Sequence, residues 1–185
     1  MSFIAEHELK SRALRKFASG MEKNASSILT ENNNKVRSQF DVFISHSTDD
    51  ADLILGLVEI LKDFGLKSYV DWLDDPLLDR KNVNTVTARI LRQRIKQSKC
   101  LLYAYSENST NSKWMPWELG YADGEIRKVV ICPISKKSGG TFKLEEYLGI
   151  YPYLEYFELS NLPTFGKRFW IYGLQDSPKL LNNWI

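Results

Sequence analysis

The sequence predicts an α/β domain in which a parallel β-sheet is covered by helices on both faces. Short apolar runs alternate along the chain with longer segments whose apolar residues recur at helical spacing. The run Cys100–Tyr105 contains no charged residue, which is typical of a strand that is covered on both sides. The chain has 185 residues, 43% hydrophobic and 26% charged, and this suffices for one folded domain with a modest extension.

The first 38 residues are expected to form a helical extension followed by a linker. Residues 3–30 are rich in Ala, Glu, Lys, Leu and Arg and contain no proline, which favours a helix. The polar run 31–35 is typical of a linker. We therefore expect residues 1–38 to precede a main domain that spans 39–158.

Strands and helices are expected to alternate within the main domain. A helix is predicted over 49–64, because its apolar residues recur on one face and Gly65 can end it. The same criteria predict the other elements. They are strands at 40–44, 67–71, 100–105, 129–134 and 153–157, helices at 85–97 and 112–124, a long loop at 72–84, and a short helical stretch up to Leu148.

The last segment, 159–185, is unusually aromatic for a chain end. We expect it to pack on the domain or on a neighbouring subunit rather than to extend into solvent. The aromatic residues concerned are Phe165, Phe169, Trp170, Tyr172 and Trp184.

Charge and composition limit the partners. A net charge of +2 gives no indication of a nucleic-acid partner. No apolar run approaches the ~20 residues that a helix needs to span a bilayer, and the charged start does not resemble a signal peptide. Cys100 and Cys132 lie in apolar runs and are expected to be buried thiols, not a disulfide. These features predict a cytoplasmic protein that binds neither nucleic acid nor membrane.

A ligand site is expected at one edge of the sheet. Small parallel sheets often have the strand order 2-1-3-4-5, and their ligands bind beyond the carboxyl ends of the strands, where the order reverses between strands 1 and 3. Several side chains should meet at this switch point. They are Ser45 and His46 after the first strand, Tyr105 and Ser106 at the end of the third, and Trp72 after the second.

Trp114 and Glu118 are the strongest candidates for chemistry at this edge. They lie four residues apart at the start of the helix after the third strand, so they share a helix face. The ring can stack on a base or a pyridinium, and the carboxylate can stabilise positive charge on a ribose. In the alternative interpretation, Trp114 and Trp117 are core or subunit-contact residues, Glu118 is a surface acid, and His46 is a satisfied turn residue.

Other chemistries lack the residues they require. No glycine-rich phosphate loop follows the first strand, and no serine lies in a G-x-S-x-G turn. The two histidines and two cysteines lie far apart in the sequence. Neither a metal site nor a bound cofactor is therefore expected.

Three motifs, in this order and at these intervals, resemble the bacterial branch of the TIR (Toll/interleukin-1 receptor) family. They are FDVFISHSTDDADL, YVDW and SKWMPWELGYADG, and the resemblance covers roughly 39–158. It implies a flavodoxin-like sheet and an enzyme that cleaves NAD as a substrate, releasing nicotinamide and producing ADP-ribose or a cyclic or modified form of it. Glu118 matches the family's catalytic glutamate, and Trp114 matches an aromatic residue found four positions before it.

The chain is also similar to TIR enzymes of Thoeris-type antiphage defence. That resemblance implies self-association, and a separate effector protein that reads the nucleotide product. There are two departures from the family pattern. The segment 72–84 matches the family's BB loop but contains no glycine, and Ser47 and Thr48 occupy positions where some members carry basic residues. The phosphates of NAD would then be bound by backbone amides, by Arg80 or by Lys81.

Two other functions are compatible with the sequence. One is a TIR adaptor without catalytic activity, which an NAD consumption assay would distinguish. The other is an enzyme similar to nucleoside deoxyribosyltransferases, because the run Glu118–Ala122 resembles their Glu-x-Gly-Tyr-Ala segment. A comparison of nucleosides with NAD as substrates would distinguish that one.

Overall fold

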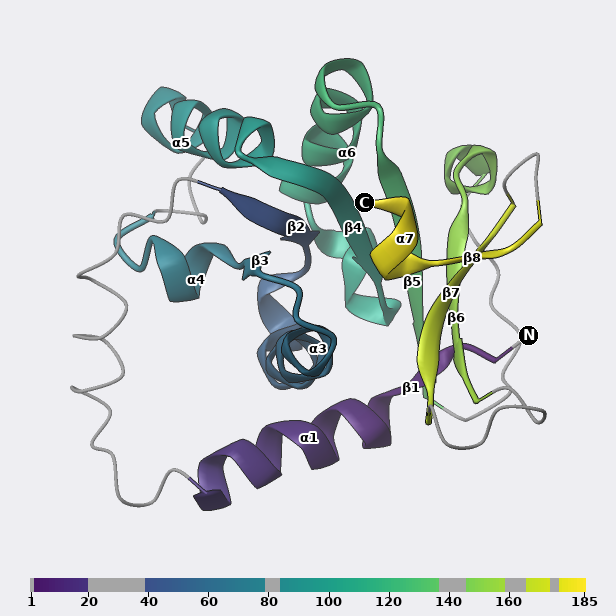
Figure 1. Ribbon diagram of the computed structural model, residues 1–185. Coiled ribbons are helices and arrows are strands. Elements are labelled where there is room, and N and C mark those ends of the chain that lie inside the picture. The colour runs from purple at the N-terminus through teal and green to yellow at the C-terminus, as the bar shows by residue number, and fades with distance from the viewer. Residues whose placement is uncertain (1, 20–38, 79–83, 137–145, 159–165, 174–176) are drawn as a thin grey trace.

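The computed structural model describes residues 2–19, 39–78, 84–136, 146–158, 166–173 and 177–185. Their strands form one sheet with the order β3-β2-β4-β5-β6-β7-β8, to which β1 is added through β5 (Figure 1). The strands are β1 (Ile4–Ala5), β2 (Phe40–Ser45), β3 (Ser68–Tyr69), β4 (Ser98–Tyr105), β5 (Val129–Ser135), β6 (Tyr153–Phe157), β7 (Arg168–Tyr172) and β8 (Lys179–Leu180). The helices are α1 (Glu6–Ser19), η1 (Thr48–Asp50), α3 (Ala51–Asp63), α4 (Asp71–Asp74), α5 (Thr85–Lys96), η2 (Glu107–Asn111), α6 (Trp114–Glu125), η3 (Glu146–Ile150) and α7 (Leu181–Trp184).

The five predicted parallel strands are present in the predicted order. β3, β2, β4, β5 and β6 correspond to strands 2, 1, 3, 4 and 5, and each neighbouring pair is parallel. The expected extent of the sheet was wrong, because the described residues contribute eight strands to it and not five. β7 and β8 continue the sheet beyond β6 as antiparallel strands, so the aromatic C-terminal segment packs on the domain by extending its sheet.

The N-terminal segment was expected to be helical from residue 3, but α1 begins only at Glu6. Ile4 and Ala5 instead pair in parallel with the end of β5. On the other side, the amide of Tyr156 in β6 donates to the carbonyl of Ser2 at 2.7 Å. The first residues of the chain therefore fill the space between the diverging ends of β5 and β6.

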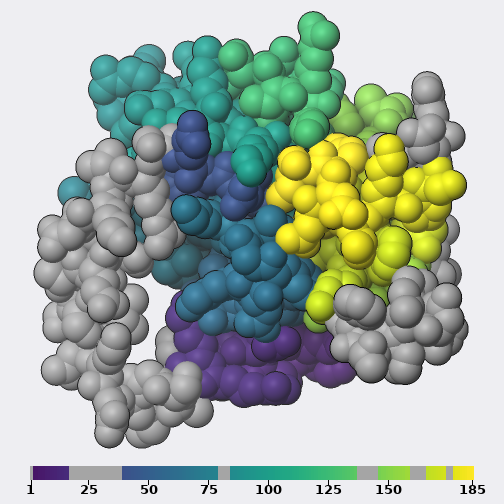
Figure 2. Space-filling model, viewed as in Figure 1, coloured from purple at the N-terminus to yellow at the C-terminus, as the bar shows by residue number. Residues whose placement is uncertain are grey.

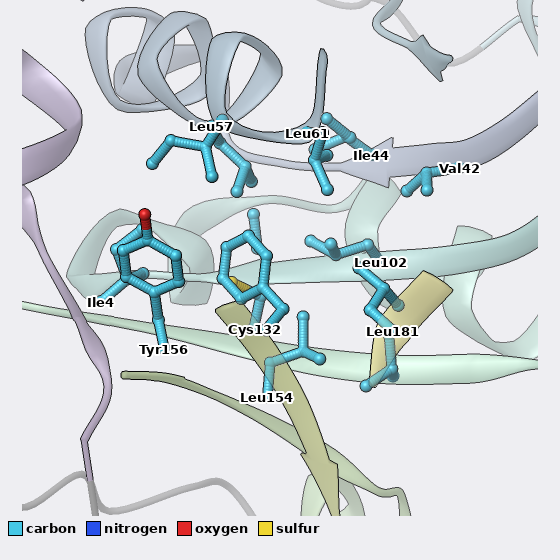
Figure 3. Close-up of a cluster of buried hydrophobic side chains, with 14 of the residues drawn as sticks. Ile4, Val42, Ile44, Leu57, Leu61, Leu102, Cys132, Leu154, Tyr156 and Leu181 are labelled. Carbon is cyan, nitrogen blue, oxygen red and sulfur yellow. The ribbon is translucent and has the colours of Figure 1, made fainter. Parts of the chain in front are cut away.

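Two apolar clusters lie on the two faces of the sheet, because side chains alternate along each strand. On one face, β2, β4 and β5 pack against α3, with Leu181 of α7 in the same cluster (Figure 3). Leu9 of α1 also belongs to this cluster. On the other face, the same strands pack against α5 and α6. This is the expected covering of both faces by helices, and it places α6 on the face opposite to α1 and α3.

Gly56 allows α1 to pack directly against the backbone of α3. A Cβ atom at this position would lie 2.0 Å from the carbonyl oxygen of Leu9, far inside any real contact distance. Leu9 is fully buried, and Ala13, one turn further along α1, is buried as well. The absence of a side chain at Gly56 is therefore what allows α1 to join the core.

Cys100 and Cys132 are buried free thiols, as predicted. Burial raises the pKa of each thiol to about 12, so neither is a reactive thiolate at neutral pH. Among the described residues, no helix is both long enough and apolar enough to cross a membrane.

Candidate active site

Glu118 lies in the second turn of α6, and its side chain is completely buried. The hydroxyl of Ser45, the last residue of β2, donates to its Oε2 atom at 2.6 Å. These two residues are 73 positions apart in the sequence, and the sheet order brings them together at the predicted switch point. The interpretation of Glu118 as a surface acid is therefore wrong.

The bond from Ser45 gives Glu118 a defined orientation. A carboxylate taken out of water costs free energy unless hydrogen bonds replace its hydration. The Ser45 hydroxyl is one such donor, and it fixes Oε2 relative to the end of β2. The result is an oriented acidic group at the edge where ligands of this kind of sheet bind.

Trp114 lies one turn before Glu118 and is only 7% exposed. It belongs to the apolar cluster under α5 and α6, and its ring meets that of Trp117 edge to face, with centroids 5.5 Å apart. This packing agrees with the alternative interpretation of Trp114 as a core residue. Stacking of Trp114 on a substrate ring stays a prediction.

His46 is buried and is bonded within the protein through both ring nitrogens. Its Nε2 lies 3.0 Å from Nε1 of Trp72, and an indole N–H can only donate, so Nε2 accepts. The other nitrogen, Nδ1, then carries the proton and donates to the carbonyl of Ile44 at 2.9 Å. His46 thus has the bonding of a satisfied turn residue, and its contact with a substrate stays a prediction.

Around Trp72 the structure differs from the prediction, which placed a strand at 67–71 and a loop at 72–84. Residues Asp71–Asp74 form the short helix α4. The Asp74 carboxylate accepts from the amide of Val70 at 2.9 Å, and the Trp72 indole is bonded to His46. Both contacts are made to groups outside α4, and they stabilise this short helix.

Asp75 connects the start of the 72–84 segment to α5 through hydrogen bonds. It accepts from Nε and Nη2 of Arg94 at 2.8 and 2.9 Å, and from the hydroxyl of Tyr69 at 2.9 Å. Burial raises the pKa of Asp75, but the hydrogen bonds from Arg94 and Tyr69 outweigh burial and hold the pKa below its ordinary value. The ionised form of Asp75 is therefore stabilised by folding.

We expect Arg94→Gln to lower the free energy of unfolding at pH 7 by about 1–2 kcal/mol, because a two-point bond to a carboxylate is lost. A lowered pKa in the folded state stabilises the fold above the unfolded pKa of roughly 3.9, and this stabilisation is lost as the pH falls through the folded pKa. Urea unfolding of both proteins between pH 7 and pH 3 measures the difference.

The matched control is Lys99→Gln, which removes the ion pair of a 61% exposed lysine with Asp41. We expect it to change the free energy of unfolding at pH 7 by less than about 1 kcal/mol. An effect of Arg94→Gln that stays undiminished at acid pH would contradict the assignment to Asp75.

Ser106 and Tyr105 lie at the end of β4, next to the switch point. Tyr105 is buried in the same cluster as Trp114. The Ser106 hydroxyl donates to Oδ2 of Asp50 at 2.5 Å, and the side-chain amide of Asn108 donates to Oδ1 at 2.7 Å. Asp50 follows β2, so its carboxylate connects the two strands that flank the switch point.

Asp50 and Asn108 were not anticipated as residues of this site. The sequence gives Asp50 a role only as one of several acids at a helix start. Nothing in the local spacing indicates that its partners lie 56 and 58 residues away. The order of the strands supplies the missing information, since it places the segments that follow β2 and β4 side by side.

The structure does not place every expected contact. Arg80 and Lys81, expected to meet phosphate, lie outside the described residues. In the parts of the chain that are described, no group of three or more His, Cys, Asp or Glu residues is arranged to hold a metal ion.

Residues 42–163 match the family model of the TIR domain. This match covers more than half of the chain and contains Ser45, Asp50 and Glu118. The chain therefore belongs to the TIR-domain family.

Three curated relatives are similar to this chain in sequence. The chain is 44% identical over 147 residues to "Probable 3' cyclic ADP-D-ribose synthase ThsB'" of Bacillus cereus (strain MSX-D12), covering 79% of this chain and 75% of that protein. It is 33% identical over 105 residues to "Putative cyclic ADP-D-ribose synthase TIR2" of Cytobacillus dafuensis, and 33% identical over 98 residues to "Probable 2' cyclic ADP-D-ribose synthase TcpO" of Methanobrevibacter olleyae. These two matches cover 56% and 50% of this chain but only 27% of each relative.

Among solved structures, the TIR domain of the Toll-related receptor TRR-2 from Hydra magnipapillata is similar to this chain. The match covers 63% of this chain and 84% of the receptor-domain chain. The TM-score is 0.47 and the sequence identity is 19%. Membership of the family rests on the sequence matches.

Proposed function

We propose that this chain is an NAD-cleaving TIR enzyme that converts NAD into nicotinamide and cyclic ADP-ribose, as a signal in bacterial antiphage defence. The observation that carries the proposal is the buried Glu118 carboxylate, bonded to Ser45 at the carboxyl edge of the sheet. Membership of the TIR family supports it. The names of the three relatives, all cyclic ADP-D-ribose synthases, support it further.

In this proposal Glu118 stabilises the positive charge that forms on the ribose. The bond between C1′ and the nicotinamide nitrogen breaks, and its electron pair leaves with nicotinamide, which departs as a neutral molecule. A carboxylate held near the sugar stabilises the resulting cation, and electrostatic stabilisation of this kind supplies several kcal/mol. A hydroxyl of the adenosine half then bonds to C1′ and releases its proton, which closes the ring. Water in its place gives ADP-ribose.

The other predicted side chains would shape the pocket around this reaction. Ser45 is proposed to orient Glu118, while the rings of Trp72, Trp114 and Tyr105 and the polar groups of His46 and Ser106 line the bound NAD. NAD is the substrate, and the reaction as written balances without a further cofactor. We propose that it takes place in the cytoplasm, in a self-associated form of the chain, and that a separate effector protein reads the product.

The two alternative functions are less well supported. A buried carboxylate stabilises a fold poorly unless it is well paired, so a pure adaptor gains little from a carboxylate buried at the position of Glu118. A deoxyribosyltransferase would use the same carboxylate on nucleosides, but the relatives are named for products of NAD.

Product analysis tests the proposal. We expect the purified chain, at concentrations high enough for self-association, to release nicotinamide and a product that lacks one water relative to ADP-ribose. Mass spectrometry distinguishes cyclic ADP-ribose from ADP-ribose by this difference in mass, and comparison with standards identifies the isomer. The 3′ isomer is expected, because the relative at 44% identity is named for it. Intact NAD at every protein concentration would favour the adaptor, and cleavage of nucleosides but not NAD would favour the deoxyribosyltransferase.

A further inference from the structure

A cavity of about 530 Å³ lies on the face of the sheet opposite to α6, between α1, the end of α3, and the start of β7. In the view of Figure 2, α1 lies directly below α3, and the C-terminal segment borders α3 at the upper right. The lining residues of α1 recur at helical spacing, so one side of this helix forms a wall. They are Glu8, Ser11, Arg12 and Arg15, with His7 beside them.

Two aromatic rings line the cavity, and cations lie over both of them. Phe64 follows α3, and the guanidinium of Arg168 lies 5.0 Å from the centre of its ring. Tyr156 belongs to β6, and the ammonium of Lys167 lies 5.6 Å from its ring centre. The lining of the cavity thus combines two aromatic rings with positively charged groups.

Positive charge exceeds negative charge in this lining. The cations are Arg12, Arg15, Lys167 and Arg168, and the anions are Glu8 and Asp63. Arg12 is paired with Asp63 at 2.7 Å, and Lys167 is paired with Glu8. Two positive charges, those of Arg15 and Arg168, therefore remain without a balancing carboxylate in the lining.

We propose that this cavity binds a small phosphate ester of nucleotide size. A phosphate monoester carries close to the two negative charges that would balance Arg15 and Arg168, and arginine is well suited to bind phosphate oxygens at two points. The hydroxyl of Ser11 is a further donor in the wall. The base or sugar would lie against Tyr156 and Phe64, and the volume is within the range of small-ligand sites, roughly 300–1,000 Å³.

This site is distinct from the proposed catalytic site. Glu118 is on α6, which packs on the other face of the sheet, and the residues that line the cavity do not include those around Glu118. Binding of a ligand in this cavity is therefore independent of NAD cleavage at Glu118. A ligand here would connect α1 to the start of β7, and it would raise the thermal stability of the chain because it binds the folded state alone.

Calorimetric titration of the full chain with AMP tests this site, with adenosine and inorganic phosphate as comparisons. We expect AMP to bind at least about tenfold more tightly than adenosine, and to bind more weakly as salt is raised. Inorganic phosphate should compete with AMP but bind more weakly, since it lacks the ring. Equal affinity for AMP and adenosine, or no binding of AMP at millimolar concentration, would overturn the proposal.

Variants separate this cavity from any binding of AMP near Glu118. Arg15→Gln and Arg168→Gln should each weaken AMP binding by about tenfold. Lys10→Gln is the matched control, because Lys10 is an exposed cation on the same helix outside the cavity and should leave AMP affinity unchanged. Arg15 is exposed, so Arg15→Gln is expected to fold even if Arg168→Gln does not. Unchanged AMP affinity in folded Arg15→Gln would show that AMP binds elsewhere.

Discussion

Replacing Glu118 with Gln is expected to reduce NAD cleavage by about a thousandfold while the fold remains intact. Gln has the same shape and can still accept the hydrogen bond from Ser45, but it carries no negative charge. The stabilisation of charge on the ribose is therefore lost, and losses of about 10²–10³ in kcat are typical when one preorganised group is removed from an active site. Release of nicotinamide measures activity, and circular dichroism with thermal unfolding monitors the fold.

Glu125→Gln is the matched control for this experiment. Glu125 is at the far end of the same helix, where it pairs with Lys96 at the surface. The change in charge is the same, and we expect the activity to remain. Full NAD cleavage by folded Glu118→Gln would rule out Glu118 as the catalytic carboxylate.

Ser45→Ala extends the comparison to the residue proposed to orient Glu118. The loss of a hydrogen bond to a charged group costs about 1.5–3 kcal/mol, so a fall in kcat of roughly ten- to a hundredfold is expected. If Ser45 acts by orienting Glu118, then Ser45→Ala in the Glu118→Gln background should cause little further loss. Fully additive losses would instead indicate that Ser45 acts independently of the carboxylate.

Replacing Gly56 with Ala is expected to lower the free energy of unfolding by about 3 kcal/mol or more. The added Cβ would lie 2.0 Å from the backbone oxygen of Leu9, and a backbone atom cannot turn away as a side chain can. The two helices must separate, which costs more than the usual 1–3 kcal/mol for overpacking in a core. Urea unfolding measures the loss, and faster proteolysis within α1 would show where the packing has failed.

Gly124→Ala, in α6, provides the comparison. No heavy atom lies within 4 Å of the position its Cβ would take, and the residue is helical and exposed. Its substitution should raise stability by up to about 1 kcal/mol through helix propensity alone. Similar effects at the two glycines would show that α1 and α3 are not in close backbone contact in solution.

The order of the five parallel strands could be predicted because it depends on local signals. Apolar runs, helical spacing and the glycine at residue 65 define each element, and general rules of connection order them. β1 could not be predicted in this way, because Ile4 and Ala5 form a strand only through pairing with Ile134 and Ser135 far along the chain. β7 did have a local signal, because Phe169–Tyr172 is a run of aromatic and β-branched residues, which favour strands, but its pairing with β6 depends on contacts that no local pattern shows.

The site was predictable to the extent that the strand order determines it. Ser45 and Glu118 were both expected at the switch point, and they meet there. The hydrogen bond between His46 and Trp72 was not foreseen, because it depends on the short helix α4, which has too few residues to produce a periodic pattern. Gly56 illustrates the same limit, since a glycine within a helix gives no sign of which neighbour approaches it.

The placement of β1 between β5 and β6 has a practical consequence for the design of shortened chains. A fragment cut to the limits of the family match, 42–163, would lack β1, which pairs with β5 at Ile134, and β7, which pairs with β6. Such a fragment would expose unpaired strand edges, which promote aggregation. β1 pairs with β5, and Ser2 bonds to β6, so the N-terminal residues contact strands that are synthesised much later. These residues can take their final position only after residues 129–157 have emerged from the ribosome.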